Sequence, residues 1–247
     1  MPWLFILSIL IQALLIIHCI KTGRNTIWIW VIALLSYAGI LAYVAVELIP
    51  DLFRSRTAQR TARGMKKALD PGAELRRYES EVRVGGGNVA SLQRYAEELT
   101  RQGRYDDAIA EYRKALTGLY EHDPNLMLGV ARAQFEKGDA AGARATLDEL
   151  IRLNPDFRSA QGHLLYARAL ESEGNTTKAL EEYKALAPSY PGAEAAVRYA
   201  QLLKAQGHAD DSRKVALDLL EQSRIAPAHY RRAQREWLDL AERLAAR

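Results

Sequence analysis

The stretch GRYDDAIAEYRKAL, residues 103–116, decides the fold, because its pattern occurs four times along the chain. A glycine opens each copy, and successive glycines stand 35, 36 and 33 residues apart: Gly103, Gly138, Gly174 and Gly207. A small residue lies seven positions before each glycine and another five positions after it: Ala96, Ala131, Ala167 and Ala200 before, and Ala108, Ala143, Ala179 and Ser212 after. Such a period indicates a stack of repeated supersecondary units.

Each unit is predicted to be two helices joined at the glycine. Glycine adopts positive φ without steric cost and therefore ends the first helix. The small residues flank the turn, where the two helices must come close, and a larger side chain would force them apart. Pro155 and Pro191 follow their glycines by 17 residues and end second helices. The fold class expected from this pattern is all-α.

The repeat resembles the tetratricopeptide repeat (TPR) family, whose unit is about 34 residues long. The resemblance covers roughly 88–224 and rests on residues 103–116 and on GNTTKALEEY, residues 174–183. The chain departs from the family in three ways, of which one is that the fourth unit lacks the terminal proline. The first unit has about four extra residues before Asp123. The family's early tryptophan is replaced in the four units by Leu92, Met127, His163 and Ala196. The resemblance implies an α-solenoid of about four helix pairs whose concave face binds other polypeptides.

The basic charge of the chain is concentrated in one segment. The formal net charge is +4, but residues 51–87 carry nine Lys or Arg against five Asp or Glu, whereas residues 88–247 are nearly balanced. A local excess of this kind does not predict nucleic-acid binding. Cys19 is the only cysteine, so the sequence excludes a disulfide framework and a thiolate metal site.

The first 50 residues are predicted to form a transmembrane helical hairpin. Residues 2–20 carry no charge, and residues 26–48 carry only Glu47 near their end. Runs of this length match the ~20 residues that a helix needs to cross hydrocarbon. The alternative is a cleaved signal peptide, but the sequence lacks a basic segment before the apolar run and a clear small-residue cleavage site.

A basic block directly after the second apolar run sets the expected orientation: Arg54, Arg56, Arg60, Arg63, Lys66 and Lys67. By the positive-inside rule, both termini and the repeats face the cytoplasm. The block is also a candidate membrane-surface site for anionic lipid headgroups. The sequence equally supports a block that only sets the topology.

The stretch KTGRNTIWIWVIALLSYAGILAYV, residues 21–44, resembles the two-span N-terminal segment of bacterial cardiolipin synthases of the phospholipase D superfamily. The resemblance implies a bacterial inner membrane. Catalysis in that family resides in an H-x-K-x4-D element further along the chain. None of the histidines here is followed two residues later by lysine: His18, His122, His163, His208 and His229. The membrane segment is therefore expected without the catalytic domain.

The sequence holds no recognisable catalytic or metal-binding constellation. The histidines are scattered singly, and no G-x4-G-K-[ST] phosphate loop occurs. His163 is favoured as a packed core residue. We therefore predict no enzyme activity, no catalytic residue, no metal and no cofactor.

A partner-binding surface is predicted on the concave face. In the TPR family, positions ten, six and three residues before the turn glycine point inward, and they give the candidate set Leu128, Arg132, Phe135, Leu164, Arg168 and Gln201. Arginines one repeat apart suit an extended acidic segment or a C-terminal carboxylate. The alternative is that both arginines pair with neighbouring acids such as Glu136 and Glu171.

The predicted organisation is a hairpin at 1–50, a basic juxtamembrane helix and glycine-rich linker at 51–87, a solenoid at 88–225 and a capping helix at 226–247. A docking role for the last helix is the alternative. The predicted function is a membrane-anchored adaptor that binds a protein partner at the cytoplasmic side of the inner membrane. The alternative function is an accessory subunit of a lipid-synthesis or envelope-assembly enzyme, held through the hairpin. The sequence names neither the partner nor the oligomeric state.

Overall fold

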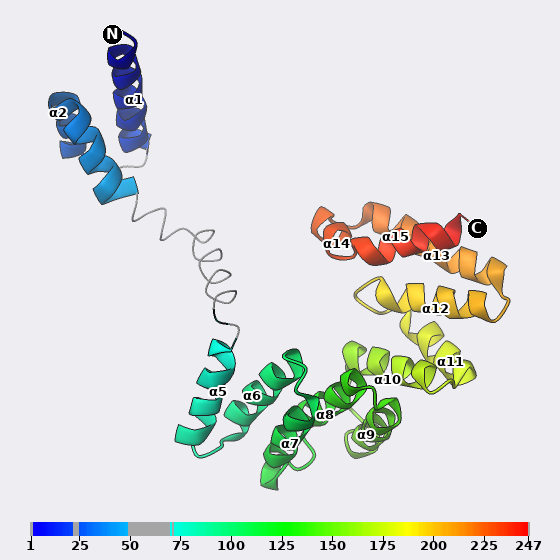
Figure 1. Cartoon of the computed structure of the whole chain (residues 1–247). Helices are drawn as coiled ribbons and strands as arrows, with labels where there is room; N and C mark the ends of the chain where they lie inside the picture. The colour runs from blue at the N-terminus through cyan, green and yellow to red at the C-terminus, as the bar shows by residue number, and fades with distance from the viewer. Residues whose placement is uncertain (1, 22–24, 49–69, 71, 247) are drawn as a thin grey trace. The chain divides into compact units, whose positions relative to one another are not determined.

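The computed structural model describes residues 2–21, 25–48, 70 and 72–246, and these ranges contain helices and turns without strands (Figure 1). The chain divides into two compact units, Met1–Ala73 and Glu74–Arg247. Each unit is described by itself. The predicted basic block at residues 54–67 lies outside the described residues, and the four predicted segment boundaries stay predictions.

The N-terminal unit is a pair of helices, α1 (Pro2–Lys21) and α2 (Ile27–Tyr43), and α2 continues into a π-helical turn, η1 (Val44–Leu48). Their contact is centred on Cys19, Ile32 and Tyr43, which are fully buried. The Tyr43 hydroxyl lies 3.1 Å from Nδ1 of His18, so one polar pair joins the two helices. Within the described residues, no helix combines the length and the apolar character that crossing a bilayer requires.

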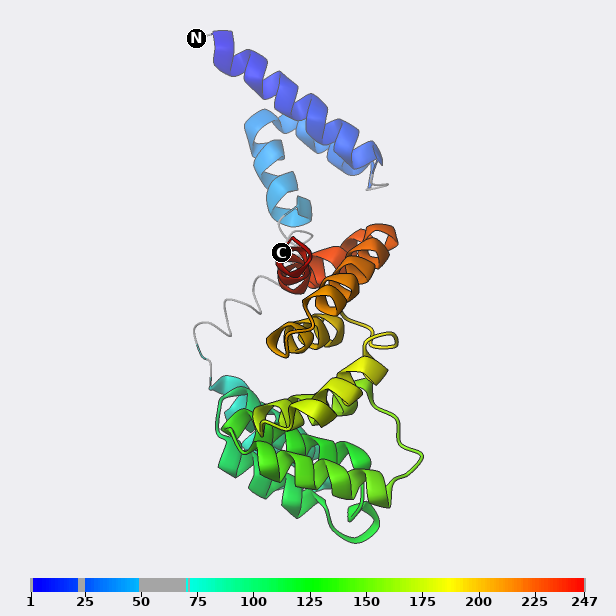
Figure 2. The same ribbon diagram turned by 90° about the vertical axis from the view of Figure 1, so that its right-hand side faces the viewer.

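The second unit begins with α5 (Ala73–Val84) and continues as four consecutive helix pairs (Figures 1 and 2). The pairs are α6 (Val89–Arg101) with α7 (Tyr105–Ala115), α8 (Pro124–Lys137) with α9 (Ala140–Leu153), α10 (Ala160–Ser172) with α11 (Thr176–Leu186), and α12 (Glu194–Ala205) with α13 (Ala209–Ile225). The extra residues of the first unit include a short 3-10 turn, Gly118–Tyr120. The predicted stack of four TPR-like pairs is therefore confirmed.

The turn glycines adopt the conformation that the repeat predicts. Their φ angles are 77°, 95°, 78° and 86° in chain order. In each turn the residue after the glycine donates its backbone N–H to a carbonyl five residues earlier, as Asp139 does to Gln134 at 2.9 Å. The small residues on both sides are at most 1 % exposed, because each lies in the contact between paired helices.

The first helices line one side of the stack and the second helices the other. Helix α6 contacts α8 and α8 contacts α10, while each second helix packs against the first helix of the next pair. We call the side formed by the first helices the inner face and the side formed by the second helices the outer face.

The C-terminal segment differs from the single predicted helix. It forms two helices, α14 (Ala228–Ala233) and α15 (Arg235–Ala245), which are separated at Gln234. The break lets the Gln234 side chain accept a 2.9 Å hydrogen bond from the backbone N–H of Ala193, a fully buried residue at the start of α12. Helix α15 packs on α12 and α13 through buried apolar residues: Leu238, Ala241 and Ala245. It covers the apolar end of the stack, as a capping helix does.

Candidate functional site

Two of the six residues predicted to bind a partner are core residues. Leu128 and Leu164 are 9 % and 3 % exposed and belong to core clusters of the second and third helix pairs. They pack helices together and offer almost no surface to another molecule. The accessible part of the predicted set is therefore Arg132, Phe135, Arg168 and Gln201, on α8, α10 and α12.

Arg168 is half-buried between two neighbouring first helices. Its guanidinium carbon lies 4.7 Å from the centre of the Phe135 ring on α8, and its Nε lies 4.0 Å from Oε1 of Glu194 on α12. A cation over an aromatic face and a carboxylate at its edge both stabilise this position. Arg168 therefore already serves to join three repeats, and a partner would compete with these contacts.

Arg132 is different, because its side chain is exposed on the inner face and forms no ion pair with the residues that the structure describes. It lies near the buried phenol of Tyr112. The pKa of Tyr112 is raised to about 12, mainly by burial and also by the charge of Glu97, while the charge of Arg132 opposes the rise. Arg132 is thus an inner-face cation that is available to an acidic ligand.

A polar network that the sequence did not predict lies between α10, α11, α12 and α15. The Tyr183 hydroxyl donates a 2.6 Å hydrogen bond to Glu171, and burial together with this acceptor raises the Tyr183 pKa. Arg198 lies 3.6 Å from Glu171, donates to Glu194 at 2.8 Å, and places its guanidinium 5.4 Å from the Trp237 ring centre. Glu171 thus pairs with Arg198 and Tyr183. Of the alternative in which Arg132 and Arg168 pair with neighbouring acids, the structure shows a pair for Arg168 alone among the described residues, and its acid is Glu194.

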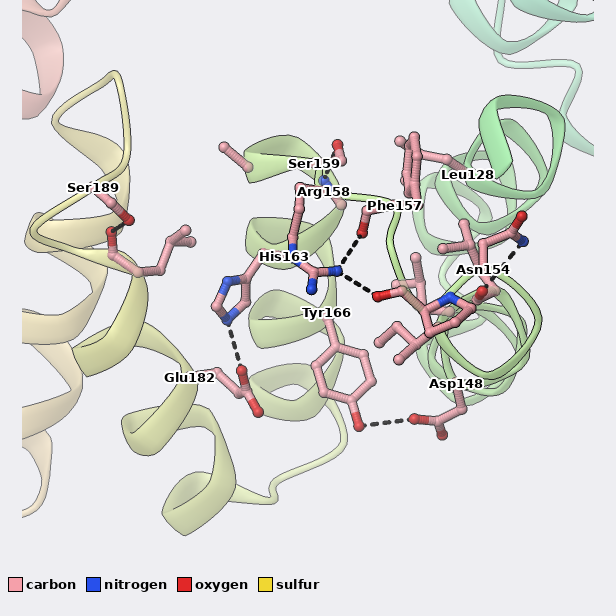
Figure 3. A pocket seen from close by; sticks show the side chains of 17 residues that line it. Leu128, Asp148, Asn154, Phe157, Arg158, Ser159, His163, Tyr166, Glu182 and Ser189 are labelled. Carbon is pink, nitrogen blue, oxygen red and sulfur yellow. Dashed lines mark hydrogen bonds and ion pairs between the residues drawn. The ribbon is translucent and has the colours of Figure 1, made fainter. Parts of the chain in front are cut away.

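A cavity of about 630 Å³ lies on the outer face between α9 and α11 (Figure 3). We call it the outer groove and define it by Leu147, Asp148, Ile151, His163, Tyr166 and Glu182. Figure 3 shows His163 and Tyr166 extending from α10 toward opposite walls. Nε2 of His163 lies 2.6 Å from Glu182 on α11, and the Tyr166 hydroxyl donates to Asp148 on α9 at 2.9 Å. These two pairs hold the walls of the groove in place.

A smaller cavity of about 270 Å³ occupies the equivalent place one repeat earlier, between α7 and α9. There Met127 stands at the position of His163 and is only 5 % exposed. The sequence favoured His163 as a core residue, but its side chain is 36 % exposed. The polar imidazole turns toward Glu182 rather than filling the space, and the groove opens as a result. The sequence shows that a histidine, His163, takes the place of a bulky residue here. It does not show that this histidine contacts the carboxylate of Glu182.

The described residues contain no cluster of three or more His, Cys, Asp or Glu side chains arranged to hold a metal ion. The arrangement on both faces instead offers charged and apolar surface to another molecule.

The fold and these surfaces define an all-α solenoid of TPR-like repeats. Residues 99–169 match the family model of the tetratricopeptide repeat. A curated relative, the TPR repeat-containing protein YpiA of Bacillus subtilis (strain 168), is 32 % identical over 106 residues, which are 43 % of this chain. The chain covers 24 % of the length of that relative.

Solved structures of TPR proteins share the fold at low sequence identity. MamA superposes with a TM-score of 0.54 at 21 % identity, over 64 % of this chain and 93 % of the other. A thermophilic TPR protein of Thermus thermophilus, TTC0263, gives 0.51 at 20 % identity, over 76 % and 93 %. YrrB, described as a TPR protein with an unusual peptide-binding site, gives 0.50 at 16 % identity, over 68 % and 92 %. None of these similarities tests the resemblance of residues 21–44 to cardiolipin synthases.

Proposed function

We propose that this chain is a non-enzymatic scaffold that binds a protein partner on the inner face of its repeats. The observation that carries the proposal is Arg132, an exposed inner-face cation without an ion pair to any described residue, on a TPR-like stack. Phe135 and Gln201 extend the same face with aromatic and amide surface. The partner segment that suits this face is extended and acidic, or ends in a free carboxylate. The peptide-binding site in the description of YrrB supports a polypeptide ligand for such a stack.

We further propose that α1 and α2 attach the scaffold to a bacterial inner membrane as a two-pass anchor, with both termini and the repeats in the cytoplasm. The support is the uncharged sequence of residues 2–20 and the large apolar side chains that face outward from the pair. Trp3, Trp30 and Leu34 are 84 %, 68 % and 76 % exposed. Apolar surface in contact with water costs about 25 cal/mol per Å², and lipid removes that cost. Residues 54–67 then lie against anionic headgroups.

The attachment is tested by fractionation of cells that express the full chain. We expect the chain in the membrane pellet after alkaline carbonate washing and in the supernatant only after detergent is added. Recovery in the carbonate supernatant would refute the anchor without affecting the inner-face proposal.

The same exposed apolar surface favours a second candidate, an accessory subunit of a lipid-synthesis or envelope-assembly enzyme contacted through the hairpin. Replacing residues 1–50 by an unrelated two-span anchor separates the two functions. Retained partner capture supports the scaffold, and lost capture supports the hairpin as the contact surface.

The inner face is tested by Arg132→Glu. We expect at least a tenfold loss of the partner recovered by crosslinking in intact membranes. The exchange removes the charge-assisted hydrogen bond from Arg132 to an acidic group of the partner and introduces a repulsion between two negative charges. The thermal midpoint should not change, since the side chain is exposed. The matched control is Arg113→Glu, the same exchange at an exposed outer-face position on α7. Equal recovery from both variants would show that the partner binds elsewhere.

A further inference from the structure

The outer groove has the size and lining of a site for a short peptide segment. Its volume of about 630 Å³ falls within the range of roughly 300–1,000 Å³ that is common for ligand pockets. Leu147 and Leu186 form apolar parts of the wall and are 2 % and 3 % exposed, while Ile151 at the rim is 55 % exposed. A bulky apolar side chain that enters the groove would therefore meet apolar surface and would cover Ile151.

Glu182 is the carboxylate of the groove that remains available for a ligand. Its Oε2 faces Nε2 of His163 at 2.6 Å, but its Oε1 has no hydrogen-bond partner among the described residues, and the side chain is 35 % exposed. Asp148 is already neutralised, because Arg144 donates to it at 2.8 Å and Tyr166 donates to its other oxygen. One negative charge therefore faces the groove beside an orienting imidazole.

The loop before α10 adds a positive charge to the lining of the groove. Nη1 of Arg158 donates to the backbone carbonyls of Pro155 at 2.6 Å and of Phe157 at 3.2 Å. Figure 3 shows this guanidinium near the loop that leads into α10. Because its partners are uncharged carbonyls, its charge is not cancelled, and it repels a cation that approaches it. Glu182 is the side chain of the groove that attracts a cationic ligand group.

The lining of this groove differs from that of the cavity one repeat earlier. In the equivalent cavity one repeat earlier, Arg113 stands at the position of Asp148 and Thr146 at the position of Glu182. That cavity therefore lacks a carboxylate at the position of Glu182, although Glu121 and Glu149 line it elsewhere, and Met127 stands where His163 stands in the outer groove. The two cavities therefore differ in volume, about 270 against 630 Å³, and in whether a carboxylate faces the position of His163.

We propose that the outer groove is a second polypeptide-binding site, separate from the inner face. Its occupant is a partner segment that inserts a bulky apolar side chain beside Ile151 and Tyr166 and sets a neighbouring Lys or Arg against Oε1 of Glu182. The inner face suits an acidic segment, so the two faces hold segments of opposite charge.

The probe is a random peptide library displayed on phage and selected on the full chain in detergent micelles. We expect the enriched peptides to share a bulky apolar residue next to Lys or Arg. A fluorescent copy of the best peptide is then titrated against variants by anisotropy. Glu182→Gln should weaken binding about tenfold, because a charge-assisted hydrogen bond is lost. The control is Glu181→Gln, the same exchange at an adjacent exposed residue outside the groove, and it should change binding less than about twofold.

Two further variants test the pocket itself. His163→Trp fills the groove, and Ile151→Lys places a repelling cation on an exposed rim position where folding is not affected; both should abolish binding. Arg132→Glu should leave it unchanged, so a failure here is distinct from a failure of the inner-face proposal. The inference is overturned if no peptide is enriched, if the enriched peptides are acidic and depend on Arg158, or if Ile151→Lys binds as tightly as the natural chain.

Discussion

Replacing Gly129 by alanine is expected to lower the free energy of unfolding of the repeat unit by about 1–3 kcal/mol, the usual cost of overpacking a core. An added Cβ would lie 2.5 Å from both Cε1 and Cζ of the Tyr112 ring, which is 4 % exposed. The ring cannot move freely, because α7 and α8 pack closely around it. In an open helix the same exchange stabilises by roughly 0.5–1 kcal/mol, so the sign of the effect reports this contact.

Urea unfolding followed by circular dichroism measures the loss. The control is Gly162→Ala in α10, where an added Cβ would meet its nearest atoms at 3.3 and 3.4 Å, and we expect little change. Tyr112→Leu supplies the second test. If the ring is the obstacle, Gly129→Ala must cost clearly less in that background than in the natural chain. Equal costs in the two backgrounds would remove Tyr112 from the explanation.

The repeat architecture could be predicted because it depends on local rules that recur. Positive φ at Gly103 and its three counterparts, and small residues where paired helices cross, are dictated by sterics within one unit. The same rules do not determine which inward position remains accessible. Leu164 was assigned to the inner face by its position in the repeat, yet contacts with neighbouring helices bury it. Accessibility depends on the next unit, and periodicity alone does not supply it.

The polar contacts were even harder to predict from the sequence than accessibility, because each joins residues from different units. Arg168 was correctly placed on a first helix, but its contacts with Phe135 and Glu194 come from the units before and after it. Gln234 was placed inside a single terminal helix, whereas the helix is interrupted at this residue and its side chain accepts a hydrogen bond from Ala193. The outer groove arises in the same way, because Tyr166 of the third unit meets Asp148 of the second. A sequence read one unit at a time has no signal for such pairs.

Replacing Arg198 by methionine is expected to loosen the C-terminal end of the stack by about 1–3 kcal/mol. Removing one partner of a fully buried ion pair costs roughly 3–5 kcal/mol. The value is discounted here because the side chains of Arg198, Glu194 and Glu171 are 23 %, 19 % and 33 % exposed. Methionine keeps much of the packing, so the loss comes from two carboxylates without their cation and from the missing contact with Trp237.

Trp237 supplies a local measurement, because the other tryptophans are Trp3, Trp28 and Trp30 near the N-terminus. In a background with those three replaced by phenylalanine, its fluorescence reports the docking of α15 on α12. In the Arg198→Met variant, we expect the fluorescence transition of Trp237 and the loss of helix measured by circular dichroism to have different midpoints. The reason is that repeat arrays unfold unit by unit when an interface weakens. Arg235→Met is the matched control, because that side chain is 82 % exposed and only 4.0 Å from Asp239 at its nearest approach.

The double variant, Arg198→Met with Glu171→Gln, shows which part of the network causes the loss of stability. Glu171→Gln removes the carboxylate but keeps an acceptor for the Tyr183 hydroxyl, so it should restore part of the stability that Arg198→Met loses. If instead the two losses simply add, the uncompensated charge is not the cause, and the contact of Arg198 with Trp237 must hold the cap. If Arg198→Met is as mild as Arg235→Met, the network does not fasten α15, and its apolar contacts alone keep the end of the solenoid closed.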